Sequence, residues 1–249
     1  MKAQPPSFDV LGVRVDAITM TDALATLDRL LRTRARGYLV FCTVSSILSA
    51  RDDHDVARAM SKAALVTPDG MPLVWLGKSR ANTPVERVYG PDFLRAVLER
   101  GVPLRHFFYG GASGVPEQVA EAVGRYEGCE VVGTYSPPTL EPGSIDHDAI
   151  PIINEARPDV VWVGLGHPKQ ELWMSVMSPE LDVPVLVGVG AAFDFLAGTK
   201  REAPGWMKRA GLQWVHRLAS EPSRLWRRYI FGNARFLFLL ARERLTGHR

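Results

Sequence analysis

The sequence predicts a Rossmann-like α/β domain, a mostly parallel sheet flanked by helices, followed by a basic helical appendage at the C-terminus. Short β-branched and aromatic runs alternate with segments of helical periodicity over most of the chain. Two of these runs, residues 160–166 and 183–190, are apolar on both faces, which is typical of parallel strands covered by helices on each side. The alternation stops near residues 200–205, so we expect an α/β core at residues 1–199 and an appendage at 200–249.

Each element is predicted from its run or from the residues that bound it. Strands are expected at residues 38–43, 105–109, 130–132, 159–164 and 183–189, and the apolar stretch at 65–67 is treated as a further strand end. Helices are expected at residues 21–33, 45–62, 91–100, 116–126, 145–156 and 168–177. Thr21 is the expected N-cap of the first helix, and Pro91, Pro116 and Pro168 suit the first turns of theirs.

The composition excludes several classes of protein. Of the 249 residues, 46% are hydrophobic and 23% are charged, a balance typical of folded globular proteins rather than disordered ones. Cys42 and Cys129 have no CxxC spacing, so neither a disulfide framework nor a structural zinc site is expected. No apolar run has the length of a signal peptide or approaches the roughly 18 residues of a membrane span, so we expect a cytoplasmic protein.

The net charge of +3 is unevenly distributed along the chain. Residues 1–199 hold 18 Lys and Arg against 24 Asp and Glu, a net charge of −6. Residues 200–249 hold 12 against 3, a net charge of +9. This asymmetry indicates that the appendage meets an anionic partner.

Polar residues follow the first two expected strands, at the edge where open parallel sheets bind ligands. Thr43 and Ser45 either hydrogen-bond a ligand or cap the next helix. Asp69 stands between Pro68 and Gly70, which favour a tight turn and hold its carboxylate in one place. A carboxylate held at a strand end suits a general base, and an Asx-turn residue is the alternative interpretation.

Glycine-rich turns follow two later strands and suit an anionic ligand. Gly110 and Gly111 precede a helix, and the N–H groups of such a turn and of a helix N-terminus favour negative charge. Gly166 leads into a helix that opens with Lys169 and Gln170. The lysine suits a phosphate, and the glutamine suits a sugar or a base edge. Together these turns predict a site for a polar, phosphate-bearing ligand.

Six stretches occur in the order in which one protein family has them, over about residues 8–238. They read TPDGMPLVW, ERVYGPDFL, FFYGGASG, DVVWVGLGHPKQELW, VGVGAAFDFLAG and GLQWVHRLASEPSRLWRRY. With these stretches the chain resembles the WecG/TagA/CpsF glycosyltransferases, glycosyltransferase family 26. The patterns GxPKQExW and VGxxFDxxAG are long and unusual, which makes the resemblance specific.

The resemblance implies an inverting transferase that moves a hexose from a UDP-sugar to a polyprenyl-diphosphate-linked saccharide in cell-wall or exopolysaccharide biosynthesis. Reactions of the family include the transfer of glucose, N-acetylmannosamine or its uronic acid. The resemblance also implies a peripheral protein on the inner face of the plasma membrane. The UDP-sugar is a substrate, and no cofactor is expected.

The resemblance further implies roles for single residues. The family's proposed general base matches Asp69, and its donor-site glutamine and aspartate match Gln170 and Asp194. Contact with the acceptor's diphosphate or the membrane is expected from Arg217, Arg224, Arg227 and Arg228. Donor binding is expected from Thr43, Ser45, Gly70, Arg87, Gly110, Gly111, Gly166, Lys169, Gln170 and Asp194.

The chain departs from the family's pattern after the first long strand. Many members read Thr-x-Asn-x-Glu there, whereas Ser45 and Ile47 stand in place of the Asn and Glu. Because that Asn helps bind the donor sugar in the N-acetylmannosamine enzymes, the same sugar is not implied here. Ser45 and the GTYSPP segment at residues 133–138 favour another hexose.

Other chemistries receive less support. The DxD sequences at residues 53–55 and 146–148 match the metal-holding pair of many sugar-nucleotide transferases, but both lie in helix-like sequence. We interpret them as solvated helix segments or caps and predict a metal-independent enzyme. His216 is interpreted as a helix-face residue. The altered Asn and Glu positions leave a non-catalytic nucleotide-sugar-binding protein as the alternative, and the absence of GxGxxG disfavours an NAD-linked oxidoreductase.

The appendage has two further features. In a continuous helix Arg224, Arg228, Arg235 and Arg242 share one face beside apolar side chains, which suits an anionic membrane surface and a diphosphate. If the helix breaks at residues 232–233, arginines on the two sides of the break need not share a face. The alternatives are a tail that packs its aromatic residues on the core, contact with nucleic acid, which we do not expect, and a homo-oligomer, which the apolar surface also fits.

Overall fold

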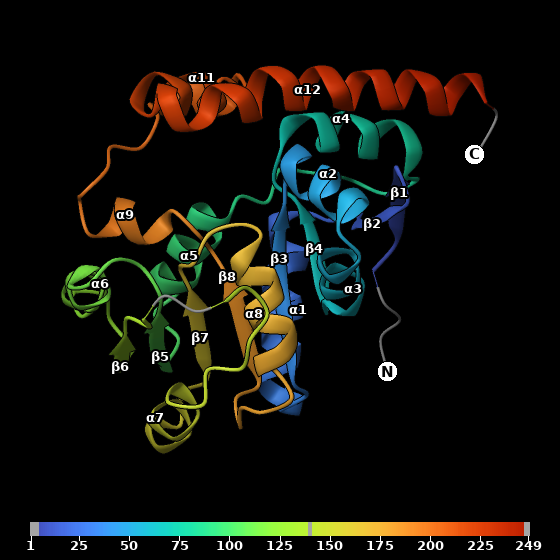
Figure 1. The fold of residues 1–249 in the computed structure, drawn as a ribbon. Helices are drawn as coiled ribbons and strands as arrows, with labels where there is room; N and C mark the ends of the chain where they lie inside the picture. The colour runs from blue at the N-terminus through green and yellow to red at the C-terminus, as the bar shows by residue number, and fades with distance from the viewer. Residues whose placement is uncertain (1–4, 139–140, 247–249) are drawn as a thin grey trace.

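The computed structural model describes residues 5–138 and 141–246, although not the side chains of Arg209, Arg224 and Arg228. Its centre is a six-stranded sheet in the order β4-β3-β8-β7-β5-β6, in which all neighbouring strands are parallel (Figure 1). The strands are β3 (Gly37–Cys42), β4 (Leu65–Pro68), β5 (Leu104–Tyr109), β6 (Cys129–Tyr135), β7 (Val160–Val163) and β8 (Val185–Gly188). The predicted Rossmann-like α/β fold is confirmed.

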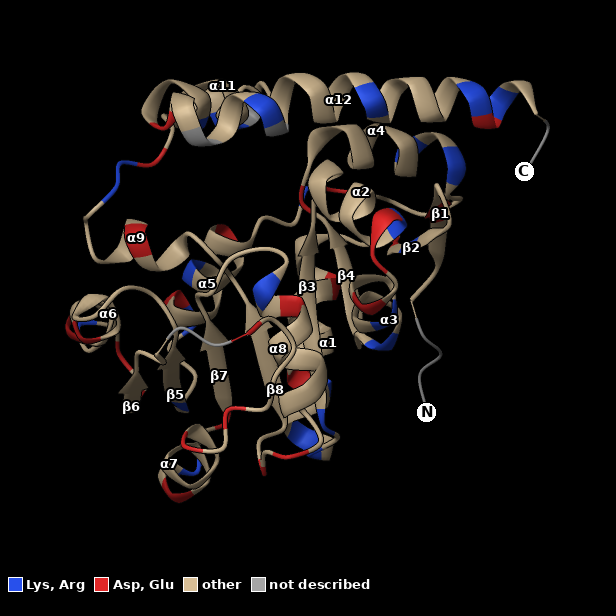
Figure 2. Ribbon diagram, in the orientation of Figure 1, with Lys and Arg blue, Asp and Glu red and all other residues tan. Residues whose placement is uncertain are grey.

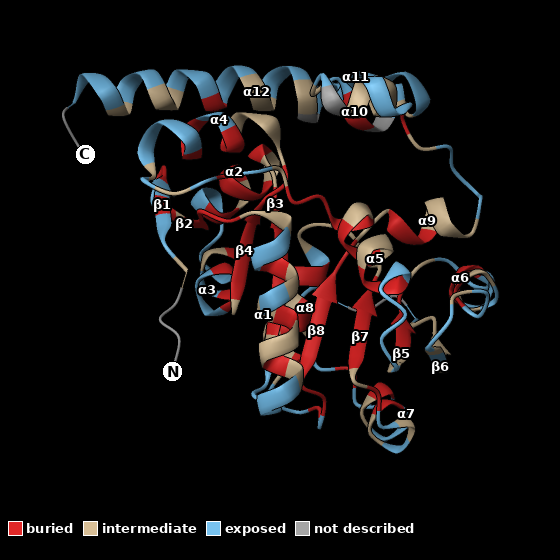
Figure 3. Cartoon of the chain, turned by 180° about the vertical axis from the view of Figure 1, so that it is seen from behind, coloured by how far each residue is buried: buried red, intermediate tan, exposed pale blue. Residues whose placement is uncertain are grey.

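Helices cover both faces of the sheet, because alternate residues of each strand are apolar on opposite faces. Leu39 and Phe41 of β3 pack with the buried side chains of α1, α5 and α6, whereas Val40 and Cys42 pack with those of α3, α7 and α8. Figure 3 shows β4, β5, β7 and β8 as buried over most of their length, whereas the edge strand β6 is not. The core helices are α1 (Met20–Thr33), α2 (Val44–Asp52), α3 (His54–Lys62), α4 (Met71–Arg80), α5 (Gly90–Glu99), α6 (Val115–Val123), α7 (Ala149–Ala156), α8 (Lys169–Met177) and α9 (Ala192–Leu196).

Three predicted helix boundaries are wrong, and capping explains each. Helix α1 is capped by Thr19 rather than Thr21, because the Thr19 hydroxyl accepts from the backbone N–H of residue 22, whose carboxylate accepts from the Thr19 N–H. The helix predicted over residues 45–62 is two helices, because the Asp53 carboxylate caps α3. Helix α7 begins four residues late, after Asp146, which accepts from the backbone N–H of residue 149 at 3.2 Å.

Four elements were not predicted, and two of them form a hairpin. An antiparallel hairpin of β1 (Ser7–Val10) and β2 (Val13–Asp16) packs on the same side of the core as α3 and α8. Its turn has positive φ angles at Leu11 and Gly12. The other two are α4, which directly follows the β4 turn, and the short helix α9 after β8. The remaining predicted elements are present, with boundaries that differ by a few residues.

The appendage is a set of three helices that lies along one edge of the core. It consists of α10 (Gly205–Arg209), α11 (Gln213–Ser220) and α12 (Pro222–Leu245). Figure 1 shows α12 as a long helix above α2 and α4. Leu225 and Phe236 of this helix are buried, and its Arg235 donates to both carboxylate oxygens of Asp52 at 2.6 Å. Helix α12 is therefore attached to the core by apolar packing and by an ion pair.

The outward side of α12 carries large apolar side chains among its described residues. The helix is continuous through residues 232–233, so no break there interrupts its periodicity. Arg235 is exposed but pairs with Asp52 of α2, so at this position the expected stripe contacts the core domain. Figure 2 shows scattered basic residues along the helix. The exposed large apolar side chains of α12 are Trp226, Ile230, Phe231, Leu237, Phe238 and Leu245. The aromatic residues Phe231 and Phe238 therefore do not pack on the core.

Candidate active site

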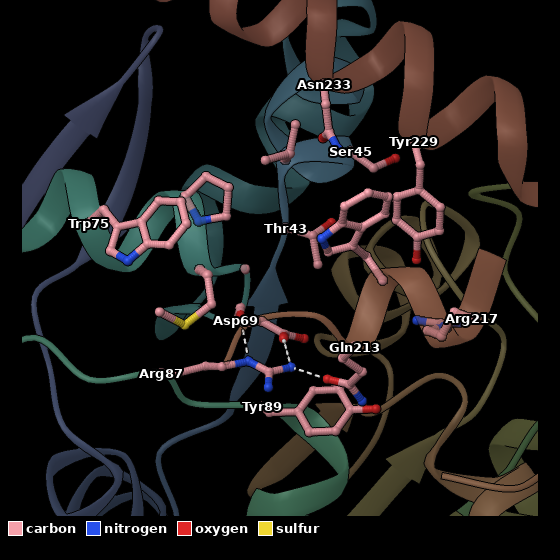
Figure 4. A pocket seen from close by; sticks show the side chains of 16 residues that line it. Thr43, Ser45, Asp69, Trp75, Arg87, Tyr89, Gln213, Arg217, Tyr229 and Asn233 are labelled. Atoms are coloured by element: carbon pink, nitrogen blue, oxygen red, sulfur yellow. Dashed lines mark hydrogen bonds and ion pairs between the residues drawn. The ribbon is translucent and has the colours of Figure 1, made fainter. Parts of the chain in front are cut away.

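Two cavities meet at the carboxyl ends of the central strands. The first, of about 360 Å³, is called the sheet cavity. It is lined by Phe41, Thr43, Ser46, Asp69, Tyr89, Gly90, Pro91, Gly111, Gly164, Leu165, Gly166, His167, Pro168, Lys169, Gln170, Gly188, Val189, Gly190, Ala191, Phe193, Asp194, Lys200 and Arg217. The second, of about 240 Å³, is called the appendage cavity because α11 and α12 close it. It is lined by Thr43, Val44, Ser45, Asp69, Gly70, Met71, Pro72, Trp75, Arg87, Tyr89, Gly211, Gln213, Trp214, Arg217, Tyr229 and Asn233 (Figure 4).

Asp69 lies where the two cavities meet. Both cavities share four lining residues, which are Thr43, Asp69, Tyr89 and Arg217. Strand pairing fixes this position, because the Asp69 N–H donates to the Cys42 carbonyl at 2.9 Å as β4 ends beside β3. The residue is only 9% exposed. A single carboxylate is thus presented to two separate ligand-sized spaces.

The turn around Asp69 differs from the expected one in a single respect. Gly70 has an ordinary negative φ of −77° and forms the N-cap of α4. A Cβ atom at this position would lie 3.7 Å from the Thr43 Cα, an ordinary contact. The backbone therefore does not require glycine here, and the expected tight turn is not what positions Asp69.

Burial and one arginine set the ionisation of Asp69. Burial raises the pKa of the Asp69 carboxyl to about 6, while the positive charge of Arg87, and to a lesser extent that of Arg217, opposes the rise. The Arg87 Nε donates to the Asp69 main-chain carbonyl at 2.7 Å, and its Nη2 lies 3.3 Å from Oδ1. The Arg87 guanidinium also stacks over the Tyr89 ring at 4.4 Å. A carboxylate with a pKa just below neutrality suits proton abstraction at physiological pH.

The structure divides the expected donor-binding residues between the two cavities. In the sheet cavity lie Thr43, Gly111, Gly166, Lys169, Gln170 and Asp194. In the appendage cavity lie Thr43, Ser45, Gly70 and Arg87. The neighbour of Ser45 in sequence, Ser46, lines the sheet cavity instead, and Ile47 is buried in the core.

Gly110 is not among the lining residues of either cavity, and its role is structural. Its φ of +103° lies in the left-handed region, and an added Cβ would approach the Gly164 carbonyl carbon to 3.0 Å. Its N–H donates to the Tyr135 carbonyl at 2.9 Å, so that donor is already used by the protein. Close strand packing therefore accounts for this glycine.

The side chain of Gln170 is held so that its oxygen is an acceptor in the sheet cavity. Its Nε2 donates to the Gly188 carbonyl at 3.0 Å and to the Glu171 carboxylate at 3.3 Å. Both partners are acceptors, so the amide has one allowed orientation. The Gln170 Oε1 is buried and has no hydrogen-bond partner among the described residues. A ligand that satisfies it must bring a hydroxyl or an N–H group.

A polar cluster behind Gln170 was not predicted. Glu171 is fully buried, and its Oε2 lies 3.2 Å from the His167 Nδ1. The other ring nitrogen of His167 hydrogen-bonds the Ser49 hydroxyl at 2.9 Å. Glu171 ends the PKQE stretch and His167 directly precedes it, and the polar character of both residues gave no sign of burial. Only the packing of α8 against the core reveals that they hold Gln170.

Asp194 has a lysine partner that the sequence analysis also missed. The Lys200 Nζ lies 2.9 Å from the Asp194 carboxylate and 3.3 Å from the Glu221 carboxylate. Its hydrogen bond to Asp194 is the main reason that the pKa of Lys200 is raised. Lys169, Lys200 and Arg217 therefore bring three cationic side chains to the sheet cavity, beside the carboxylates of Asp69 and Asp194. This charge arrangement suits an anionic ligand that also carries hydroxyl groups.

The appendage supplies residues that sequence reasoning did not single out. Gln213 accepts a hydrogen bond from the Arg87 guanidinium, and Trp214, Tyr229 and Asn233 line the same cavity. The signal for Gln213 and Trp214 was their position in the GLQWVHR stretch. Tyr229 ends the longer stretch GLQWVHRLASEPSRLWRRY, whereas nothing in the sequence pattern pointed to Asn233, which reaches the cavity only through the packing of α12.

The expected appendage arginines do not form one group in the described part of the chain. Arg217 lines both cavities, whereas Arg227 lines neither and stacks over Trp226 at 5.3 Å. The side chains of Arg224 and Arg228 lie outside the described residues. His216 lies on α11, as expected of a helix-face residue.

The two DxD sequences line neither cavity. Asp53 caps α3, and Asp55 pairs with Arg58 at 2.6 Å on the surface. Asp146 is buried rather than solvated and accepts from the Tyr109 hydroxyl at 2.6 Å. Within residues 5–138 and 141–246 no group of three or more His, Cys, Asp or Glu side chains is arranged to hold a metal ion.

Comparison with known proteins identifies the family. The model of the glycosyl transferase WecG/TagA/CpsF family matches residues 8–249, nearly the whole chain. The chain belongs to this family. It is therefore an enzyme of the glycosyltransferase type, and the predicted resemblance is confirmed.

Three relatives carry the same name, N-acetylglucosaminyldiphosphoundecaprenol N-acetyl-beta-D-mannosaminyltransferase. The protein from Bacillus spizizenii is 32% identical over 174 residues, which cover 69% of this chain and 66% of the relative. The Bacillus subtilis protein is 29% identical over 187 residues, 73% of this chain and 70% of the relative. The protein from Staphylococcus aureus strain MW2 is 24% identical over 232 residues, 91% of this chain and 89% of the relative.

Proposed function

We propose that this glycosyltransferase moves a hexose from a UDP-sugar to a polyprenyl-diphosphate-linked saccharide, with inversion at the anomeric carbon and with Asp69 as the general base. The observation that carries the proposal is the position of Asp69 at the junction of two cavities. In an inverting transfer the acceptor hydroxyl attacks the anomeric carbon on the side opposite the leaving group. The base that takes the hydroxyl proton must therefore lie between the donor site and the acceptor site.

The sheet cavity is the proposed donor site. It lies at the carboxyl edge of the parallel sheet, which is the usual ligand position in open α/β sheets. Lys169 and Lys200 suit the diphosphate of a UDP-sugar, and the acceptor oxygens of Gln170 and Asp194 suit hydroxyl or N–H groups of the nucleoside or sugar. The proposed hexose is one of the sugars that the family's reactions transfer, which are glucose, N-acetylmannosamine and its uronic acid.

The appendage cavity is the proposed acceptor site. The relatives are named as transferases acting on N-acetylglucosaminyldiphosphoundecaprenol, an acceptor with a sugar, a diphosphate and a long apolar chain. Arg217 suits the diphosphate, because guanidinium groups bind phosphate oxygens in pairs. Trp75 and Trp214 offer apolar and stacking surface beside it.

The proposed reaction begins with the acceptor hydroxyl beside Asp69. The carboxylate takes the hydroxyl proton as the oxygen attacks the anomeric carbon, and UDP departs on the opposite side. General base catalysis typically supplies about 10²–10⁴-fold in rate. The remaining acceleration would come from two sources. The two substrates are held in alignment, and Lys169, Lys200 and Arg217 stabilise the negative charge that develops on UDP. We propose that no metal ion takes part.

We also propose that α12 attaches the enzyme reversibly to an anionic membrane surface. Within residues 5–138 and 141–246 the structure contains no helix with the length and apolar character to span a bilayer. Phe231 and Phe238 are 62% and 66% exposed on one side of α12, beside basic residues of the same helix. Exposed aromatic residues next to arginines are typical of helices that lie in a membrane interface. The inner face of the plasma membrane is the proposed location.

UDP release tests the reaction. The purified enzyme is assayed with UDP-glucose, UDP-N-acetylmannosamine and the uronic acid derivative against prenyl-diphosphate-linked N-acetylglucosamine. Wild type should release UDP with one of these donors only when the acceptor is present, and Asp69→Asn should lower the rate about 10²–10⁴-fold while UDP affinity changes little. UDP binding without turnover by any donor would instead favour a nucleotide-sugar-binding protein.

A further inference from the structure

We propose that the Tyr89 hydroxyl and the Gln213 amide nitrogen, together with Arg217, form a site for the oxygens of a diphosphate at the junction of the two cavities. The inference rests on the proposed function, since it deepens the description of the acceptor side of the same site. Neither Tyr89 nor Gln213 was expected to contact a ligand.

Two buried polar atoms at the junction have no partner among the described residues. Tyr89 is 5% exposed, and its hydroxyl makes no hydrogen bond. Gln213 is 6% exposed, and its Nε2 makes none. Leaving such groups unpaired costs stability, so a buried unpaired donor that faces a cavity indicates a ligand group. Figure 4 shows both side chains on the same side of Asp69 as Arg217.

The surrounding contacts make the Gln213 nitrogen a donor toward a ligand and leave the Tyr89 hydroxyl able to donate to the same ligand. Gln213 accepts from the Arg87 guanidinium through Oε1, and because a guanidinium has no acceptor, the amide cannot turn over. Its Nε2 therefore faces away from Arg87 with two hydrogens to give. Burial raises the pKa of the Tyr89 hydroxyl, so this group stays protonated near neutral pH.

Three donors on one side of the cavity select an anion. A hydroxyl, an amide NH₂ and a guanidinium together match the oxygens of a diphosphate, which accepts hydrogen bonds without donating any at neutral pH. Tyr89 and Arg217 line both cavities, whereas Gln213 lines the appendage cavity only. The diphosphate is therefore that of the lipid-linked acceptor, that of the nucleotide, or each in turn, and the experiment distinguishes these sources.

Tyr89→Phe is the central variant, because it removes one oxygen atom and keeps the ring under Arg87. Affinity for inorganic pyrophosphate, UDP and a short-chain prenyl diphosphate is measured by calorimetry, and Tm is measured without ligand. We expect Tyr89→Phe to weaken at least one diphosphate about fivefold to thirtyfold, with an unchanged or higher Tm. A loss confined to UDP identifies the nucleotide as the source, and a loss confined to prenyl diphosphate identifies the lipid.

Gln213→Glu is the second variant, since it keeps an oxygen for Arg87 and replaces the donor with an acceptor. It should weaken the same ligand more than Tyr89→Phe does. Tyr38→Phe is the matched control, because the Tyr38 hydroxyl donates to the Ala59 carbonyl away from both cavities. It should lower Tm and leave all three affinities unchanged.

The inference is wrong if Tyr89→Phe and Gln213→Glu bind every diphosphate within twofold of wild type, or if wild type binds none of them. The affinities do not depend on turnover. A weakened diphosphate site in a protein that transfers no sugar would therefore overturn the proposed function and keep the site. Normal sugar transfer by the wild type, with unaltered diphosphate affinities in both variants, would keep the proposed function and overturn the site.

Discussion

The Arg87 guanidinium holds Asp69 at two points, the main-chain carbonyl at 2.7 Å and the carboxylate at 3.3 Å. The proposed base and its counter-charge are thus positioned as one unit. Burial raises the pKa of Asp69, and the positive charge of Arg87 limits that rise. This relationship makes the pH dependence of the enzyme a direct test of the site.

Arg87→Gln should raise the pKa of Asp69 above its value of about 6, because burial is then opposed only weakly. A general base must be deprotonated, so wild-type kcat/KM should fall about tenfold per pH unit below pH 6. In the variant the same fall should begin at a higher pH. Arg36→Gln, which breaks an exposed pair with Asp182, is the control and should leave the profile unchanged. An identical profile in Arg87→Gln would contradict the assignment.

Asp69→Asn should be more stable relative to wild type at pH 8 than at pH 5. The pKa of Asp69 is about 6 in the folded protein and near 3.8 in the unfolded chain, so the folded state binds the proton more tightly. The tighter binding of this proton stabilises the folded wild type at low pH, and that stabilisation is lost as pH rises through about 4 to 6. Asp69→Asn has no carboxyl group there and does not lose stability in this way. The difference in unfolding free energy between the two proteins should grow by about 1 kcal/mol from pH 5 to pH 8. Denaturant titration at both pH values measures it, and a constant difference would argue against a raised pKa.

Glu171→Gln should weaken donor binding through Gln170. The new amide can accept or donate, so the Gln170 side chain loses one of the two acceptors that fix its orientation. We expect KM for the UDP-sugar to rise about tenfold, with a smaller effect on kcat. Glu155→Gln, on the exposed side of α7, is the control. An unchanged KM in Glu171→Gln would show that Gly188 alone is sufficient to orient Gln170.

The double variant Phe231→Glu/Phe238→Glu should detach the protein from anionic vesicles. Both side chains are largely exposed, so the change removes apolar area and adds negative charge with little effect on the core. Co-sedimentation with vesicles that contain phosphatidylglycerol measures binding. Ile152→Glu on α7 is the control, because Ile152 is 42% exposed and lies on another element. Equal binding by all proteins would exclude this side of α12 as the anchor, and a loss of self-association instead would point to a homo-oligomer.

Excess EDTA should leave most of the transferase activity intact. The carboxylates of both DxD sequences lie away from the two cavities, in capping and surface positions, so they cannot hold a metal on a nucleotide bound there. UDP release with and without EDTA is the measurement. Complete loss of activity that Mn²⁺ or Mg²⁺ restores would reverse the prediction.

Much of the site could be predicted from the sequence because its parts are local. Strand ends and glycine turns bring Asp69, Gln170 and Asp194 to one edge of a parallel sheet, and each can be recognised from its neighbours in sequence. The same local reading misjudged Gly110, since it could not tell a ligand contact from a packing requirement. It also missed Glu171, because a carboxylate at a helix start normally faces solvent.

The residue pattern by itself determined the layered α/β core, the carboxyl edge as the candidate ligand position and the family of the chain, because periodicity and strand-end chemistry are encoded over a few neighbouring residues. Only the tertiary structure decided that the ligand region is two cavities and that α11 and α12 close one of them. Gln213 lies 126 residues from Arg87 in sequence, and Arg235 lies 183 residues from Asp52. Contacts at such separations depend on how whole helices pack against the core, and no local pattern records that packing.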